Sequence, residues 1–427
     1  MQKKRFFSAL VLFGLMGQVA WVVENMYFNV FIYNMFSASA SDISLMVAAS
    51  SIVATVTTIF IGALSDRIGK RRIFISLGYI LWGISILSFA LVREDVIGKL
   101  FPLASTAAIA ITITVILDCV MTFFGSSAND ASFNAWLTDS ADPGERGRVE
   151  GINSIMPLLA ILVVFGGFMS FDLSLASSWT SIFIIIGAVV IALGIAGFFI
   201  IEEPNVVREH NTSLIAETLY SFRVSTVKTN PVFYVAILAF AIFNISIQIF
   251  MPYLIIYYEV SLELENYVLI MAPAIIIAGG VTAIYGRYYD KAGFTRAVIP
   301  TVASLCVGYL ILIFSRAVPL VFVGSLFMMI GYLSGMAIFG ALLRDRTPPE
   351  RAGAFQGIRI VGQVLIPGII GPAIGSMLLS NADVIISSDG RESFIPNVNI
   401  FIGALGVAVI AFLGIYAVYL TEKRSNK

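Results

Sequence analysis

The chain has 427 residues, of which 59% are hydrophobic and 12% charged, and its formal net charge is zero. Soluble domains are about 45–50% apolar and about 25% charged, so this composition and a mean hydropathy of +0.94 exclude an ordinary soluble protein. The zero net charge gives no support for nucleic-acid binding, and one histidine with two cysteines argues against a metal site, a cofactor or a His- or Cys-based enzyme centre.

Apolar runs long enough to cross a bilayer, about 20 residues or more, recur along the whole chain. They lie at roughly 6–36, 43–64, 73–92, 103–137, 152–171, 178–201, 231–257, 265–286, 296–315, 318–343, 353–380 and 397–420. The first run is longer than the apolar part of a signal peptide, so we expect it to be retained. We therefore predict an all-α membrane protein with twelve transmembrane helices.

A polar segment divides these runs into two sets of six. It covers residues 202–230 and opens with two glutamates and a proline. We predict an N-terminal six-helix bundle over residues 1–201, a cytoplasmic linker over 202–230 and a C-terminal six-helix bundle over 231–427. Within the linker, residues 213–223 have the pattern of a short amphipathic helix on the membrane surface.

The connection between the second and third runs is short and strongly basic. From Gly62 to Arg72 it reads GALSDRIGKRR, which leaves room only for a tight turn. Gly62 would let two helices approach closely, and Gly69 can adopt a backbone conformation that other residues resist. Asp66 is expected just before the next helix, where a carboxylate suits unpaired N–H groups. The four cations suit a loop that faces anionic lipid and the cytoplasm.

Two internal repeats indicate a duplicated chain. The glycine–aspartate–glycine spacing of the basic connection recurs 224 positions later at Gly286, Asp290 and Gly293. The segment that begins at Glu145 recurs with one inserted residue at Glu350. Parallel repeats of this kind predict two pseudo-symmetric halves.

GALSDRIGKRR resembles the signature loop between helices two and three of the major facilitator superfamily. The later copy is similar to the more degenerate loop between helices eight and nine. The resemblance implies two pseudo-symmetric six-helix bundles that transport a small molecule by alternating access, with the loop linking the halves to stabilise one face. By this resemblance Asp66 and Arg67 carry the gating role. The other candidate gating residues are Gly62, Gly69, Arg71, Asp290 and Arg359.

The distribution of lysine and arginine predicts the orientation in the membrane. With twelve helices both termini lie on one side, and 21 of the 26 cations fall on that side. Four fall on the other side, and Arg359 lies inside a helix. We therefore expect a multi-pass protein of the plasma or inner membrane with both termini in the cytoplasm.

The first run carries polar residues that a membrane helix rarely contains. At about 100° per residue, Gln18, Trp21, Asn25 and Asn29 form a narrow stripe, and Glu24 flanks it. Amides beside an aromatic ring suit a hydroxyl-rich ligand such as a sugar, although amides also hold helices together. A buried carboxylate favours a functional role, so Glu24 is a candidate proton-coupling group.

The fourth run carries Asp118, Thr122, Ser126 and Asp130 at intervals of four residues. In low dielectric a carboxyl group can exchange a proton near neutral pH or bind a cation while ionised. Asp118 and Asp130 are therefore candidate proton-coupling groups. Two alternatives stay open: Asp118 can form a structural hydrogen bond, and Asp130 can pair with Arg359 or a loop cation.

The second half offers fewer polar groups inside its runs. Asn244 and Gln248 share a face of the seventh run, the counterpart of the first, so they are candidate substrate-binding residues. In the eleventh run Gln356, Arg359 and Gln363 share a face. Arg359 can bind an anionic substrate group, pair with an acid or extend to the cytoplasmic interface.

Two subfamilies are nearest in kind, the glycoside–pentoside–hexuronide cation symporters and the sucrose–proton symporters. The first helix and the acid in helix four, Asp118, resemble both. The basic run from Gly69 to Phe74 resembles the sucrose group, and the stretch from Asn134 through Asp139 to Arg146 resembles a pattern of the glycoside group. The chain lacks the acid pair in helix two that sodium coupling of the melibiose-permease kind uses. It also lacks the arginine in helix four of many drug–proton antiporters.

These features predict a secondary active transporter, a proton-coupled symporter of a sugar or glycoside that functions as a monomer. The alternative is an exporter of an amphiphilic small molecule by proton antiport. A non-transporting sensor or scaffold is less favoured, because no loop exceeds about thirty residues and none could hold a soluble domain.

Overall fold

A computed structural model describes residues 3–102, 105–141, 145–203, 220–264, 266–347, 352–386 and 390–425. Within these residues, twelve helices are long and apolar enough to cross a membrane, from Lys3–Phe36 to Asn399–Arg424. The predicted all-α class and the helix count are confirmed. The apolar runs differ from the helices by a few residues at each end, because a helix continues past its apolar part into the polar interface.

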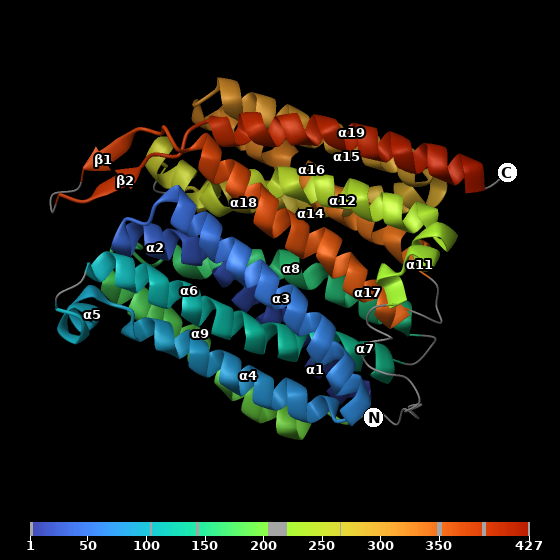
Figure 1. Ribbon diagram of the computed structural model, residues 1–427, viewed down its shortest axis with the longest axis horizontal. Coiled ribbons are helices and arrows are strands. Elements are labelled where there is room, and N and C mark those ends of the chain that lie inside the picture. The colour runs from blue at the N-terminus through green and yellow to red at the C-terminus, as the bar shows by residue number, and fades with distance from the viewer. Residues whose placement is uncertain are drawn as a thin grey trace. The chain divides into compact units, whose positions relative to one another are not determined.

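The helices fall into two compact units, Met1–Asp42 with Ala49–Thr218 and Ile43–Ala48 with Leu219–Lys427 (Figure 1). The boundaries predicted at 201 and 231 remain a prediction, because residues 204–219 lie outside the described part of the chain. Most of the expected surface helix at 213–223 lies there too. The described part of the predicted linker, residues 220–230, contains the 3₁₀ turn η4 (Tyr220–Phe222) and the short helix α11 (Val224–Thr229).

The first unit contains the helices that place the candidate site. They are α1 (Lys3–Val22), η1 (Val23–Tyr27), α2 (Phe28–Phe36), α3 (Ala40–Ile68), α4 (Arg71–Ser88), η2 (Phe89–Leu91), α5 (Glu94–Leu100), α6 (Thr106–Gly125), η3 (Ser126–Phe133), α7 (Asn134–Ser140), α8 (Arg146–Phe168) and α9 (Ala176–Ile200). Helix α4 packs closely on α9, since a Cβ added to Gly83 would lie 2.7 Å from the Gly187 carbonyl oxygen. Small residues are what permit such approach between membrane helices.

The second unit has the same kind of architecture. Its elements are α12 (Pro231–Phe250), η5 (Met251–Tyr253), α13 (Leu254–Ile256), η6 (Tyr257–Ser261), α14 (Val268–Ala292), α15 (Phe294–Phe314), α16 (Val318–Asp345), α17 (Ala352–Ile360), η8 (Val361–Leu365), α18 (Ile366–Leu378), β1 (Val384–Ile386), β2 (Glu392–Phe394) and α19 (Asn399–Ser425). The antiparallel hairpin β1–β2 was not predicted, because three-residue strands are too short for a periodicity signal.

Two turns confirm the repeat read from the sequence. Gly69 ends α3 with φ +76°, and Gly293, 224 positions later, ends α14 with φ +78°. In both places the chain enters the next helix within two residues through a glycine of positive φ, which glycine adopts without steric penalty; ψ differs, at 8° for Gly69 and 172° for Gly293. The duplication therefore extends to a glycine of positive φ between two helices, although the full backbone conformation of the two turns differs.

Four of the membrane helices contain π-helical segments among the described residues. They are η1 in the first helix, η3 in the fourth, η6 in the seventh and η8 in the eleventh. A π-segment inserts an extra residue in a turn and rotates the rest of the helix, and such segments are frequent at functional sites. Glu24 lies in η1 and Asp130 in η3, so two of the candidate acids lie on irregular backbone.

Candidate functional site

Two buried carboxyl groups meet inside the first unit. Glu24 of η1 is 6% exposed and Asp118 of α6 is 2% exposed, and the two interact electrostatically. The Thr122 hydroxyl donates to Glu24 Oε1 over 2.8 Å, and the Ser50 hydroxyl donates to Asp118. The other oxygens, Glu24 Oε2 and Asp118 Oδ1, are buried and have no hydrogen-bond partner among the described residues.

A third carboxyl group, Asp130, lies in η3 on the same side of the unit. It contributes to the electrostatic field at Glu24, and the Ser126 hydroxyl donates to its Oδ2 over 3.0 Å. The indole N–H of Trp21 lies near Asp130 but does not reach hydrogen-bonding geometry. The structure therefore groups all three predicted acids with Trp21, although they come from two different membrane helices.

Aromatic side chains lie near Asp130, which together with Glu24 and Asp118 forms the centre of the acid cluster. The Trp21 and Trp82 ring centroids are 5.2 Å apart, and Tyr79 lies 5.4 Å from Trp82. The Tyr79 hydroxyl donates to the Phe13 carbonyl over 2.8 Å and accepts from Asn129 Nδ2 over 2.7 Å. In the described part of the chain, both indole N–H groups remain without an acceptor.

Three residues of this cluster were not predicted from the sequence. They are Tyr79, Trp82 and Ser50, which lie in the second and third apolar runs. An aromatic or hydroxyl residue in an apolar run carries no periodic signal of its own, and it is common in membrane helices that bind nothing. Only the packing of these runs against the first and fourth helices reveals their place in the cluster.

The residues of the polar stripe predicted on the first helix differ in their surroundings, and their role in substrate binding remains a proposal. The prediction assumed a regular 100° step, whereas the π-segment η1 changes the phase between Trp21 and the residues after it. Asn25 is exposed and Asn29 fully buried, so the two do not share one surface. Their side-chain N–H groups donate to the Trp21 and Asn25 carbonyls respectively, over 2.7 and 3.0 Å. Gln18 is half-buried.

In the second unit, the side chains of Asn244 and Gln248 on the seventh helix both contact neighbouring protein groups. Asn244 is 6% exposed and donates to the Phe240 carbonyl over 2.9 Å. Gln248 is half-buried and packs on Gly371 of α18, where an added Cβ would lie 2.4 Å from the Gln248 Cβ. Arg359 precedes η8, and its guanidinium lies beside Gly340 of α16. The other expected gating residue of this unit, Asp290, is exposed near the end of α14.

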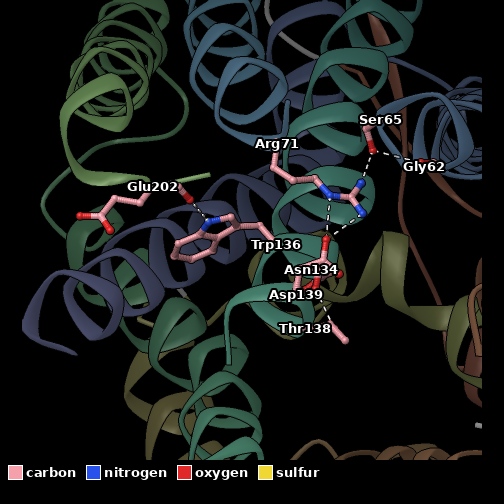
Figure 2. A network of polar contacts seen from close by, with 8 residues as sticks. All are labelled: Gly62, Ser65, Arg71, Asn134, Trp136, Thr138, Asp139 and Glu202. Carbon is pink, nitrogen blue, oxygen red and sulfur yellow. Dashed lines mark hydrogen bonds and ion pairs between the residues drawn. The ribbon is translucent and has the colours of Figure 1, made fainter. Parts of the chain in front are cut away.

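The signature loop of the first unit centres on Arg71, whose side chain is only 3% exposed (Figure 2). Its Nε and Nη2 donate to Asp139 Oδ2 of α7 over 3.2 and 3.1 Å, and its Nη1 donates to Ser65 Oγ over 2.5 Å. Ser65 in turn donates to the Gly62 carbonyl over 3.0 Å. One guanidinium therefore joins the end of α3, the start of α4 and the end of α7.

The structure also describes three other residues of this loop, and it corrects the expectations for Asp66 and Gly62. Asp66 lies in the last turn of α3 rather than ahead of α4, whose N-cap is Lys70, and its side chain is outside the described part of the structure. Gly62 is not tightly packed, because an added Cβ would meet only the Ala131 Cβ at 4.0 Å. Arg67 is exposed.

The start of the linker is attached to the same loop. Glu203 Oε1 accepts the backbone N–H of Arg72 over 3.0 Å, and so caps the first turn of α4 from outside the helix. Glu202 pairs with Arg5 over 3.0 Å. The Glu202 carbonyl accepts the indole N–H of Trp136 over 2.8 Å (Figure 2). The sequence predicted a linker at this position, but it did not predict the contacts of Glu202 and Glu203 with the first unit.

Comparison with known proteins places this architecture in a family. The profile of the Major Facilitator Superfamily matches residues 6–358. The chain belongs to the major facilitator superfamily. It is therefore a multi-pass membrane transporter with a small-molecule substrate, as its signature loop indicated.

Solved structures of this superfamily share the fold at low sequence identity. A bacterial homologue of the human lysosomal transporter Spinster, inward-facing and unoccupied, aligns with a TM-score of 0.71 and 15% identity over 98% of each chain. The nucleoside transporter NupG aligns with a TM-score of 0.65 and 12% identity over 98% of this chain and 99% of its own. No curated protein sequence matches the chain. The subfamily resemblance remains a prediction, since these likenesses show the fold alone.

Proposed function

We propose that this superfamily member is a secondary active transporter that couples proton movement to the symport of a sugar or glycoside by alternating access. One observation supports it most: the acid cluster of the first unit contains buried donors and buried acceptors that both lack partners among the described residues. The donors are the Trp21 and Trp82 indole N–H groups, and the acceptors are Glu24 Oε2 and Asp118 Oδ1.

A sugar hydroxyl suits such a mixture because it donates and accepts hydrogen bonds at once. Leaving a buried polar group unpaired costs about 1–3 kcal/mol, so a ligand that pairs several of them binds with a gain. Trp21 is only partly buried, and we propose that its ring stacks on the sugar ring. Glu24, Asp118 and Asp130 are the proposed proton-coupling groups.

The alternative, export of an amphiphilic molecule by proton antiport, has one observation in its favour. The side-chain N–H groups of Asn25, Asn29 and Asn244 all donate to carbonyls one turn earlier in their own helices. Each of these bonds engages one N–H of the amide within its own helix, which leaves fewer donors for a ligand. The sugar proposal therefore depends on the acids and tryptophans more than on the amides.

The remaining assignments rest on charge and family. We propose that the protein lies in the plasma or inner membrane as a monomer, with both termini cytoplasmic, because 21 of 26 cations fall on that side. We assign the gating role to the two signature loops, with Arg71 at the centre of the first. The other proposed contributors in these loops are Gly62, Asp66, Arg67, Gly69 and Asp290, and Arg359 in α17 is a further candidate.

Uptake by proteoliposomes tests the proposed function. A panel of radiolabelled monosaccharides, disaccharides and glycosides is offered with and without an imposed pH gradient, inside acidic or inside alkaline. We expect at least one sugar to accumulate only when protons flow inward. If no sugar moves faster than into protein-free vesicles, the symport proposal is wrong, and efflux of amphiphilic dyes from the same vesicles becomes the next assay.

The Asp118→Asn variant tests the coupling role. It should abolish accumulation against a gradient while sugar exchange at equal concentrations persists, since exchange needs no net proton movement. Asp172→Asn is the matched control, because Asp172 is exposed in the turn after α8 and its carboxylate accepts hydrogen bonds from Ser174 there. Accumulation by Asp118→Asn equal to that of this control would remove Asp118 from coupling.

A further inference from the structure

The connection between the last two membrane-spanning helices contains a hairpin with one apolar strand. Helix α18 ends at Leu378 and α19 begins at Asn399, and the strands β1 and β2 lie between them. Figure 1 shows the hairpin beyond the ends of both helices, at the end of α19 that lies away from the C-terminus. Because both neighbouring helices span the membrane, they hold the hairpin at the surface of the bilayer.

Strand β1 exposes three consecutive apolar side chains. Val384 is 52% exposed, Ile385 is 45% exposed and Ile386 is 66% exposed. Successive side chains of a strand point to opposite faces of the sheet, so β1 exposes apolar groups on both of its faces. Contiguous apolar groups on a surface outside the spanning helices mark a contact with something other than water.

The two strands differ in polarity. Glu392 of β2 is exposed directly opposite Ile386, and the half-buried Ser393 lies opposite Ile385. Apolar and polar residues are therefore divided between the two strands, whereas a half-solvated antiparallel sheet divides them between its two faces. Such a hairpin suits a boundary where one strand meets an apolar medium and the other meets a polar one.

The base of the hairpin is attached to the second unit through the β2 side. Phe394 is buried, and its ring lies edge-on to Tyr253 with the centroids 6.2 Å apart. The Ser261 hydroxyl at the end of η6 donates to the Pro396 carbonyl just after β2. These contacts fix the hairpin on the seventh helix and leave the side chains of β1 exposed.

Exposure on both faces of β1 favours lipid over a protein partner. A partner strand at the free edge of β1 would pair with its backbone in the plane of the sheet, and a flat protein surface would cover only one face. Either partner would leave apolar side chains of β1 in water. The bilayer interface surrounds a strand, and it already adjoins the hairpin. The depth is limited, because backbone groups at the free edge need water or lipid carbonyls as partners.

We infer that β1 inserts into the interfacial layer of the bilayer, with Val384, Ile385 and Ile386 in contact with lipid and Glu392 on the aqueous side. The hairpin thereby anchors the second unit to the membrane surface between its last two helices. This lipid contact goes beyond the proposed function, because it involves neither the acid cluster nor the transported molecule.

Spin-label accessibility tests the insertion in the full chain. Ile385→Cys, Ile386→Cys and Glu392→Cys are each made in a background of Cys119→Ala and Cys306→Ala, labelled with a nitroxide and reconstituted into phosphatidylcholine vesicles. Collisions with oxygen, which concentrates in the bilayer, are compared with collisions with a water-soluble nickel chelate present on both sides. We expect the oxygen-to-nickel ratio at both isoleucine positions to exceed that at Glu392→Cys several-fold.

Two labelled controls define the ends of the scale. Ile410→Cys lies in the middle of α19 at a position that is 50% exposed, so it reports the interior of the bilayer. Asp172→Cys lies in the exposed turn after α8 and reports water. The β1 labels should fall between these two controls, since the free edge of the strand limits its depth. Thermal unfolding in detergent verifies that each labelled variant is folded.

Three results would overturn the inference. One is a ratio at Ile386→Cys equal to that at Asp172→Cys, which would place β1 in water. Another is lipid contact at only one of Ile385→Cys and Ile386→Cys, because these side chains point to opposite faces of the strand. The third is a label that meets neither reagent, which would show a protein contact, and broadening by labels on other copies would identify a second copy of the chain. Each outcome is independent of the sugar uptake assay.

Discussion

Neutralising Asp139 should destabilise the first unit, because it leaves the Arg71 guanidinium buried without its counter-charge. Arg71 is 3% exposed and Asp139 21% exposed, and two hydrogen bonds of Arg71 go to Asp139 Oδ2. Removing one partner of a buried pair costs about 3–5 kcal/mol. Asparagine keeps one carbonyl acceptor and Asp139 is partly exposed, so we expect about 2–3 kcal/mol for Asp139→Asn.

A double-mutant cycle measures this interaction. The free energy of unfolding is determined in mixed micelles by denaturant titration for the wild type, Asp139→Asn, Arg71→Met and the double variant. We expect the double variant to be less destabilised than the sum of the singles by at least about 1 kcal/mol, the size found for residues in one buried network. Asp172→Asn, an exposed acid, is the control and should change the free energy of unfolding by less than about 0.5 kcal/mol.

Additive single and double variants, within about 0.5 kcal/mol, would refute the reasoning. In that case the contact between Arg71 and Asp139 would be incidental to folding. A cycle with the expected coupling and unchanged transport would instead separate the stability of the loop from its proposed gating role.

Three further substitutions act on single features, and each is measured by the same unfolding titration. Gly69→Ala should cost about 1–2 kcal/mol, because φ is +76° and an alanine Cβ is strained there. Tyr79→Phe should cost about 1–3 kcal/mol, because Asn129 Nδ2 loses its acceptor inside the unit. Glu203→Ala should cost about 1 kcal/mol, because the Arg72 N–H at the start of α4 loses its cap.

Matched controls separate these effects from general loss of packing. Gly62→Ala lies in the same loop as Gly69, but its Cβ would meet only one atom at van der Waals distance, so we expect little change. Glu202→Ala removes an exposed ion pair with Arg5, which contributes about 0–1 kcal/mol. Equal losses in Gly62→Ala and Gly69→Ala would contradict the backbone-strain argument.

Sequence alone determined the class, the twelve helices and the duplicated turn. A bilayer imposes a length of about 20 apolar residues on each helix, so the signal lies in local composition. The tight turn at Gly69 was equally local, since few residues other than glycine adopt its backbone angle. The acids at positions 24, 118 and 130 were identified as candidates because a carboxylate inside an apolar run is costly wherever its helix packs.

Only the tertiary structure shows which residues of different helices contact one another. The phase of the first helix depends on the π-segment at Val23–Tyr27, and nothing in a regular 100° step predicts an inserted residue. The contact of Glu24 with Thr122, the cap from Glu203 and the pairing of Arg71 with Asp139 join residues 68 to 131 positions apart in the chain. Such contacts depend on helix packing, which composition and periodicity leave open because they describe each helix by itself.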